Sequence, residues 1–183
     1  MSTLNVTNIK AADGTSGLSI ANTTGIVTLS KSIGFMAAIG ASSQTSLPTS
    51  TYKKIELVST HPRGFDPQSG WSNTDYYYTI PSGMGGYWLL SAHIEMSVLS
   101  PATRCIISTT ATTDQSGSNF LFYGHSGDHT TNTNNGGASC SGIANLSAGT
   151  IIKMEGYHAY GSTQTVAGHD TYGRTYLSGW RLG

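Results

Sequence analysis

The chain has 183 residues, with nine Lys and Arg against nine Asp and Glu, so its formal net charge at pH 7 is zero. Charged residues make up only 10% of the sequence, and the basic ones are scattered apart from Lys53-Lys54, which argues against binding to nucleic-acid phosphates. The 25 Ser, 25 Thr and 23 Gly are weak helix formers, whereas ten Tyr, four Phe and three Trp supply a core, so the composition predicts a folded all-β protein.

Residues 1–33 form a first segment of short alternating runs, separated by turn signals at Asp13-Gly14 and Thr24-Gly25. So few large apolar residues cannot close a core alone, so the segment must pack on the rest of the chain or on copies of itself. The alternation over residues 1–10 is unlike a secretory signal, and no apolar stretch approaches the roughly 20 residues that span a membrane. We therefore expect a β-rich N-terminal segment without membrane insertion.

Residues 34–183 form the second domain, in which turn residues separate nine longer candidate strands. The absence of helical periodicity predicts an antiparallel sandwich or barrel. Within the run from Thr150 to Tyr160, alternation places Ile152 and Met154 on one face and Lys153 and Glu155 on the other. The nine candidates are 35–41, 52–60, 75–80, 86–99, 103–110, 119–124, 137–143, 150–160 and 171–182.

Four motifs in this second domain resemble the globular heads of the complement first-component and tumour-necrosis-factor superfamily. That family has a Phe-Asp strand, a Pro- and Gly-containing entry into a long central strand, a Leu-x-x-Gly-Asp entry into a late strand, and a closing Phe-x-Gly-Phe strand. The motifs here are Phe65-Asp66, the run from Tyr78 to Ala92, the run from Leu146 to Ile152, and the run from Thr175 to Leu182. Thr150 stands where the family usually has Asp, and Trp180 replaces the closing Phe. The resemblance implies a jelly roll of about ten strands that assembles as a homotrimer.

The opening residues 1–14 also look like the N-terminal part of small fibre and spike proteins of marine tailed bacteriophages. This resemblance implies a virion protein that leaves its host by lysis, which agrees with the lack of an export signal in residues 1–10. Residues 1–33 would then be a stalk that binds other virion proteins, and the head would face the host surface. The anchoring candidates are Leu4, Val6, Ile9, Leu18 and Ile20. A capsid decoration or cement protein, or a head fibre, is the alternative, and a secreted lectin module is a third class.

Enzymatic chemistry has little support in the sequence. The nine acids are widely spaced, although distance along the chain does not exclude pairing in space. We expect no catalytic residue, no cofactor and no metal site, although Asp66 and Asp75 could contribute oxygen ligands for calcium, and three copies of one His could bind a metal on a trimer axis. Cys105 and Cys140 fit buried strand residues better than a disulfide bond.

Two polar loops are candidates for contact with a host glycan or protein. Trp71, flanked by small polar residues, is expected to be exposed and to stack on a sugar ring, with an anchor into a neighbouring virion protein as the other interpretation. The loop 125–137 is rich in amides and hydroxyls, which suit uncharged carbohydrate partners, although such composition also marks ordinary connections. The receptor-contact candidates are Trp71, Asn73, His125, Asp128, His129, Asn132, Asn134 and Asn135.

Overall fold

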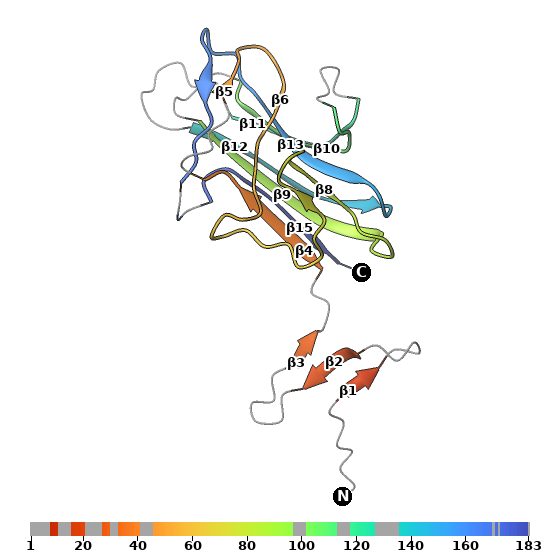
Figure 1. Cartoon of the computed structure of the whole chain (residues 1–183). Helices are drawn as coiled ribbons and strands as arrows, with labels where there is room; N and C mark the ends of the chain where they lie inside the picture. Colours follow the sequence, from red (N-terminus) through yellow and green to blue (C-terminus); the bar gives the residue numbers. More distant parts are fainter. Residues whose placement is uncertain are drawn as a thin grey trace, which may run out of the picture. The chain divides into compact units, whose positions relative to one another are not determined.

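A computed structural model describes residues 8–10, 16–20, 27–29, 33–40, 46–96, 102–112, 118–126, 136–169, 171 and 173–182. The chain divides into two compact units, Met1–Ile33 and Gly34–Gly183. The first contains a three-stranded antiparallel sheet of β1 (Asn8–Lys10), β2 (Ser16–Ile20) and β3 (Val27–Leu29), with β2 in the middle (Figure 1). Of the anchoring candidates, Ile9 lies in β1, Leu18 and Ile20 lie in β2, and Leu4 and Val6 lie outside the described residues.

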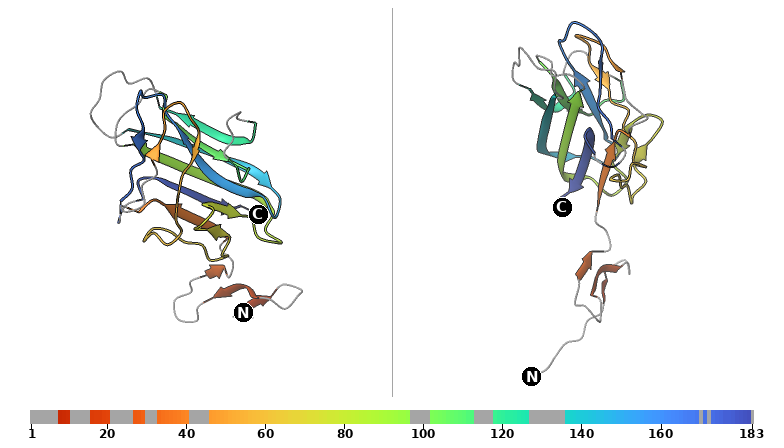
Figure 2. Two further views of the ribbon diagram at one scale, coloured as in Figure 1. Left: turned by 45° about the horizontal axis from the view of Figure 1, so that its top comes forward. Right: turned by 90° about the vertical axis from the view of Figure 1, so that its left-hand side faces the viewer.

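The second unit, called the head below, is built from antiparallel strands in two main sheets. One sheet has the order β12-β9-β15-β4, and the other has the order β11-β10-β13-β8-β7, with β6 also paired to β13. In the right-hand view of Figure 2 the four strands of the first sheet follow one another in one layer. The strands are β4 (Gly34–Ala38), β5 (Ser46–Leu47), β6 (Lys53–Lys54), β7 (Trp71–Ser72), β8 (Tyr77–Thr79), β9 (Gly86–Met96), β10 (Arg104–Ser108), β11 (Phe120–His125), β12 (Gly136–Leu146), β13 (Ile151–Tyr157), β14 (Gln164–Thr165) and β15 (Tyr176–Arg181).

The order of these strands is that of a jelly roll. The chain changes sheet between β8 and β9, between β9 and β10, between β11 and β12, and again between β12 and β13. Each of the nine expected ranges overlaps a strand, while the two-residue strands β5, β7 and β14 are additional. All the described elements are strands. The described residues contain no helix that is long and apolar enough to cross a membrane. The prediction of an all-β antiparallel sandwich is confirmed.

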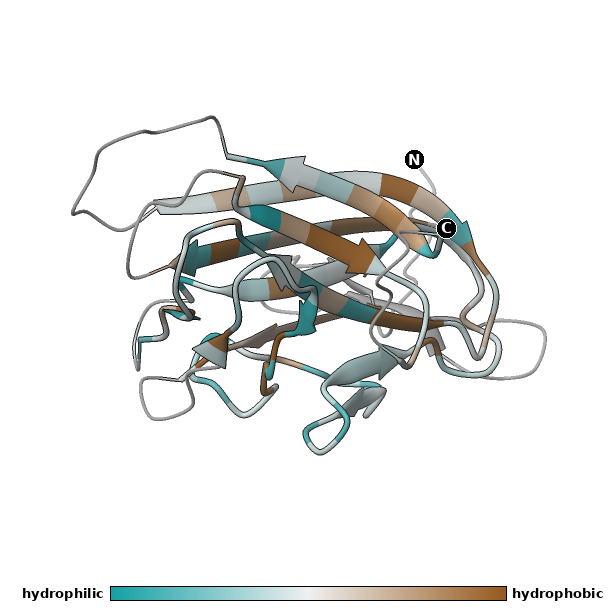
Figure 3. Cartoon of the chain, turned by 90° about the horizontal axis from the view of Figure 1, so that it is seen from above, coloured by the Kyte–Doolittle hydropathy of each residue, from teal (hydrophilic) through white to brown (hydrophobic). Residues whose placement is uncertain are grey.

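The core lies between the two sheets and is rich in aromatic rings. Along β9, Trp88, Leu90 and Ala92 are buried, and the residues between them are more exposed, as strand geometry requires. The ring of Phe35 from β4 stacks on Tyr78 from β8 at a centroid distance of 3.9 Å, which joins the two sheets. Hydrophobic residues recur along the long strands of the head in Figure 3.

Strand β13 departs from the alternating pattern because it is buried on both faces. Lys153 and Glu155, which share the face opposite Ile152 and Met154, are wholly buried and form an ion pair. The Lys153 ammonium also donates a hydrogen bond to the carbonyl of Thr112, so residues that follow β10 cover this face. A charged pair costs less to bury when each charge has a partner, so β13 can be buried on the face of Lys153 and Glu155 as well as on that of Ile152 and Met154.

Two glycines allow the edges of the two sheets to meet. A Cβ atom on Gly124 of β11 would lie 1.7 Å from the carbonyl oxygen of Ser139 on β12. A Cβ atom on Gly142 of β12 would lie 2.2 Å from the ring of Phe122 on β11. Strand β11 can therefore pack directly on β12 because both positions lack a side chain.

Candidate functional site

One face of the sheet β12-β9-β15-β4 carries a cluster of exposed apolar side chains. Strand register places Ile143, Leu89 and Trp180 in one row across three neighbouring strands. The next row contains Tyr87 of β9 and Leu182, whose N–H donates to the Tyr87 carbonyl at 2.8 Å. These five residues are 39% to 58% exposed. We call them the apolar face.

The large exposed hydrophobic residues of the head are concentrated on this face. Outside it, only Tyr123 and Tyr160 among the described residues are large, apolar and comparably exposed. Monomeric soluble proteins rarely expose a contiguous apolar patch of this kind without a partner that covers it. The apolar face is therefore a candidate contact surface for another protein.

The chemistry of the same sheet face changes from row to row. Next to the apolar row, register aligns three hydroxyl groups, those of Ser141, Ser91 and Ser178. The following row has Ser139, His93 and Tyr176, and His93 Nδ1 lies 2.7 Å from Ser139 Oγ. Burial lowers the pKa of His93, with Glu95 acting in the opposite direction, so its imidazole favours the neutral form. Any partner must match apolar, hydroxyl and imidazole rows in that order.

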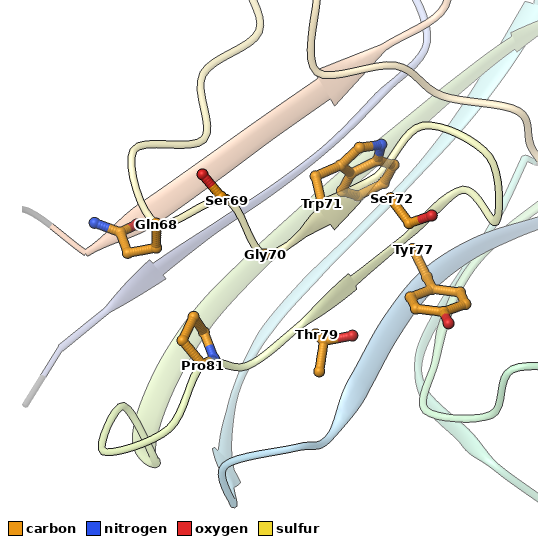
Figure 4. A pocket seen from close by; sticks show the side chains of 8 residues that line it. All are labelled: Gln68, Ser69, Gly70, Trp71, Ser72, Tyr77, Thr79 and Pro81. Carbon is orange, nitrogen blue, oxygen red and sulfur yellow. The ribbon is translucent and has the colours of Figure 1, made fainter.

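A second feature is an open groove of about 400 Å³ beside the hairpin of β7 and β8. Figure 4 shows the side chains of its lining, which are mainly small and polar. Tyr77 and Pro81 supply apolar surface, and the hydroxyls of Ser69, Ser72 and Thr79 supply hydrogen-bonding groups. Small polar groups beside one aromatic ring are chemically suited to an uncharged, hydroxyl-rich ligand. The lining residues are Gln68, Ser69, Gly70, Trp71, Ser72, Tyr77, Thr79 and Pro81.

The prediction that Trp71 is exposed was wrong, because only 8% of its surface is accessible. Trp71 pairs with Tyr78 in the β7–β8 register, and the two rings both contact Phe35 in the core. The indole Nε1–H donates to the Leu57 carbonyl at 3.3 Å. A buried Trp ring satisfies its single donor in this way, so its indole is unsuited to stacking on an external sugar.

Asp66 holds the loop that precedes this hairpin. Its two carboxylate oxygens accept hydrogen bonds from the backbone N–H groups of Gly70 at 3.1 Å and Trp71 at 2.8 Å. Asp66, which the sequence offered only as a possible calcium ligand, therefore has a structural role. Within the part of the chain that the structure describes, no three His, Cys, Asp or Glu side chains gather closely enough to hold a metal ion.

The described receptor-contact candidates do not form one site within a subunit. Asn73 is exposed in the turn between β7 and β8, and its Oδ1 accepts a hydrogen bond from the N–H of Ser59 at 2.9 Å. His125 is exposed at the end of β11. Strands β7 and β11 lie at opposite edges of their sheet, roughly 19 Å apart at about 4.8 Å per strand. The other candidates, Asp128, His129, Asn132, Asn134 and Asn135, lie outside the described residues.

The sequence interpretation missed the residues of the apolar face. Tyr87 and Leu89 alternate with buried residues along β9, which is a signal for a two-sided strand. Ile143 and Trp180, however, are far from β9 in sequence and join the same row only through strand pairing. The residues of this sheet surface could therefore not be named from the sequence alone.

The sequence matches no family model and no curated protein. Solved structures do resemble it. Eiger TNF from Spodoptera (S. frugiperda) aligns with a TM-score of 0.55 and 12% identity, over 83% of this chain and 93% of that one. Murine APRIL aligns with a TM-score of 0.53 and 15% identity, over 83% and 100% of the two chains. The globular domain of a zebrafish complement 1qA protein aligns with a TM-score of 0.53 and 9% identity, over 84% and 98%. The chain therefore has the jelly-roll fold of tumour-necrosis-factor and complement heads.

Proposed function

We propose that this chain is a non-enzymatic structural protein of a bacteriophage virion, a trimeric tail fibre or spike. Residues 1–33 attach it to other virion proteins, and the jelly-roll head contacts the host surface, with a glycan as the expected receptor. The protein would be made in the host cytoplasm and act on the outside of the particle. The observation that carries this proposal is the apolar face. Its exposed hydrophobic side chains need to be covered, either by further copies of this chain or by another protein.

A homotrimer is the assembly that best accounts for the apolar face. The sequence resemblance to trimeric heads implies such an assembly, and the head fold agrees with that resemblance. A closed symmetric oligomer covers one sheet face of every copy without leaving a free surface for further growth. Three linked heads would also raise the avidity of a weak contact with a glycan.

The virion context rests on the resemblance of residues 1–14 to phage fibre proteins and on the low charge of the chain. The groove beside Tyr77, with its three hydroxyl groups, is the described surface whose chemistry best suits a sugar. The loop 125–137 remains a second candidate for receptor contact.

The mass of the full-length protein in solution tests the assembly. We expect a mass of three chains, measured by sedimentation equilibrium. Ile143→Asp places a charge in the apolar face, and we expect that variant to dissociate into single chains. Tyr123→Asp is the matched control, because Tyr123 is 60% exposed where Ile143 is 58%, but it lies on β11 of the other sheet. A single-chain mass for the unchanged protein, or dissociation of the control alone, would contradict the proposal.

Binding experiments with the full-length protein test the role in the virion. A tail fibre or spike should bind host cells, and soluble surface polysaccharide of the host should compete with that binding. A decoration protein should instead bind empty capsids and leave host cells bare. The second result would replace the fibre proposal with the capsid alternative.

A further inference from the structure

Cys105 and Cys140 form a pair between the two sheets of the head. Cys105 lies on β10 and Cys140 lies on β12, so they belong to different sheets. The Cys140 thiol donates a hydrogen bond to Cys105 Sγ, and the two sulfur atoms are 3.8 Å apart. The Cys105 side chain is fully buried and that of Cys140 is 7% exposed. Two strands separated by 27 residues of chain, 109–135, thus place the only two thiols of the sequence in contact.

The fold brings these two thiols together at the point where the sheets meet. Gly124 of β11 is the direct neighbour of Cys105 in the strand register. The Cβ position of Gly124 lies 1.7 Å from the Ser139 carbonyl oxygen and 3.3 Å from Cys140 Cβ. The missing side chain at Gly124 therefore lets the backbone of β12 approach β10 and β11 closely enough for sulfur contact.

The two thiols are not equivalent. The hydrogen-bonding contact with Cys105 lowers the pKa of Cys140, because once Cys140 has lost its proton the Cys105 thiol can donate to the Cys140 thiolate. Burial raises the pKa of Cys105, so Cys105 keeps its proton. Cys140 is also the more accessible of the two. This asymmetry provides one nucleophile and one resolving thiol, as a redox-active pair requires.

We propose that Cys105 and Cys140 are a redox-sensitive pair that a hydroperoxide converts into a disulfide bond between the two sheets. The Cys140 thiolate attacks one peroxide oxygen, the O–O bond breaks, and Cys140 becomes a sulfenic acid while hydroxide leaves. Cys105 sulfur then attacks Cys140 Sγ and displaces the sulfenic oxygen, which leaves as water with the proton from Cys105. Two thiols are oxidised and one hydrogen peroxide molecule is reduced to two water molecules.

Little movement is needed for the final bond. A disulfide has an S–S distance of about 2.04 Å, so the two sulfur atoms, now 3.8 Å apart, must approach each other by roughly 1.8 Å. The bond would close a loop from Cys105 to Cys140 and cross-link the sheets. The loop 125–137 lies inside that closed segment. This inference does not depend on the proposed virion function.

Hydrogen peroxide and the full-length protein test the inference. We expect a loss of two hydrogen atoms in the intact mass, a peptide joining Cys105 to Cys140 after non-reducing digestion, and a Tm that rises by several degrees and returns after reduction. Limited alkylation of the reduced protein should label Cys140 before Cys105.

Two single variants serve as matched controls. In Cys105→Ala and Cys140→Ala, peroxide should produce no internal cross-link and no rise in Tm. The comparison of oxidised with reduced unchanged protein remains decisive if either variant folds poorly. Disulfides between chains, oxidation of one sulfur to a sulfinic acid, or thiols that stay reduced while the protein is folded would each overturn the inference.

Discussion

The fold buries the hydroxyl group of Tyr78 without a hydrogen-bond partner among the described residues. The Tyr78 ring is closely packed, because it stacks on Phe35 and lies against the backbone at Gly70. Burial raises the pKa of Tyr78 to about 12, and the Asp66 carboxylate contributes to that rise. The protein therefore stabilises the neutral phenol strongly over the phenolate, even though the phenol oxygen has no visible partner.

Tyr78→Phe should stabilise the head, because it removes a buried polar atom and keeps the ring. We expect a gain of about 1 kcal/mol in the free energy of unfolding, measured by urea denaturation at pH 7. Between pH 10 and about 12 the unfolded chain loses the Tyr78 proton and the folded chain retains it, so the unchanged protein should lose stability there. Tyr78→Phe has no phenol to titrate, so its free energy of unfolding should fall less over this pH range. Tyr77→Phe, on the neighbouring half-exposed residue, is the control, and a clear loss of stability in Tyr78→Phe would contradict the argument.

His93 should make the head less stable in acid. Its pKa is lowered in the folded state, so as pH falls below about 6.5 the unfolded chain takes up this proton first. The stabilisation is complete above that pH and is lost as the pH falls through the folded pKa. Thermal unfolding of the unchanged protein and of His93→Gln, from pH 7.5 to pH 5, should show a smaller fall in Tm for the variant. Equal falls in Tm would show that His93 does not contribute.

The contact between β11 and β12 depends on the lack of a side chain at Gly124. In Gly124→Ala the new methyl group would collide with the backbone of Ser139, which cannot rotate away as a side chain could. We expect destabilisation of about 3 kcal/mol, measured by chemical denaturation. Gly161→Ala is the matched control, because nothing lies within 4 Å of its Cβ position, and its effect should be close to zero. A Gly124→Ala variant as stable as the control would show that the two strands separate easily.

The strands could be predicted from the sequence because each depends on neighbours in the chain. The run from Gly86 to Met96 shows its alternation directly, and it is one continuous strand. The burial of Lys153 and Glu155 was not predictable, since the cover on that face comes from Thr112 and other residues distant in sequence. Trp71 was misjudged for the same reason: its small polar neighbours suggest a surface, but its indole reaches Leu57 and Phe35.

The candidate site was less predictable than the fold. Sequence reasoning chose loops that are rich in polar residues, and two described members, Asn73 and His125, lie at opposite edges of one sheet. The apolar face is assembled by register across β12, β9 and β15. Such a surface is a property of the assembled sheet and has no continuous signature in the chain.

The division at Ile33 and Gly34 predicts that assembly and attachment are separable. A chain that starts at Gly34 contains the whole apolar face and all of the core described here. We expect it to keep a three-chain mass by sedimentation equilibrium and to lose binding to phage particles that lack the native protein. The full-length protein is the positive control for both measurements. A single-chain mass for the shortened protein would assign the assembly to residues 1–33 instead.

The covered edge of strand β4 has a consequence for the behaviour of the head in a crowded solution. Strand β11 packs on β12, and the outer edge of β4 is covered by backbone hydrogen bonds to Val58 and Phe65. An uncovered edge presents free N–H and C=O groups on which another chain can add a strand, and this leads to aggregation. Many proteins resist such contacts by charge, but only 10% of this sequence is charged. The covered edge of β4 therefore keeps neighbouring copies from joining there through their backbones, and association at that edge is left to side chains, which can select a partner.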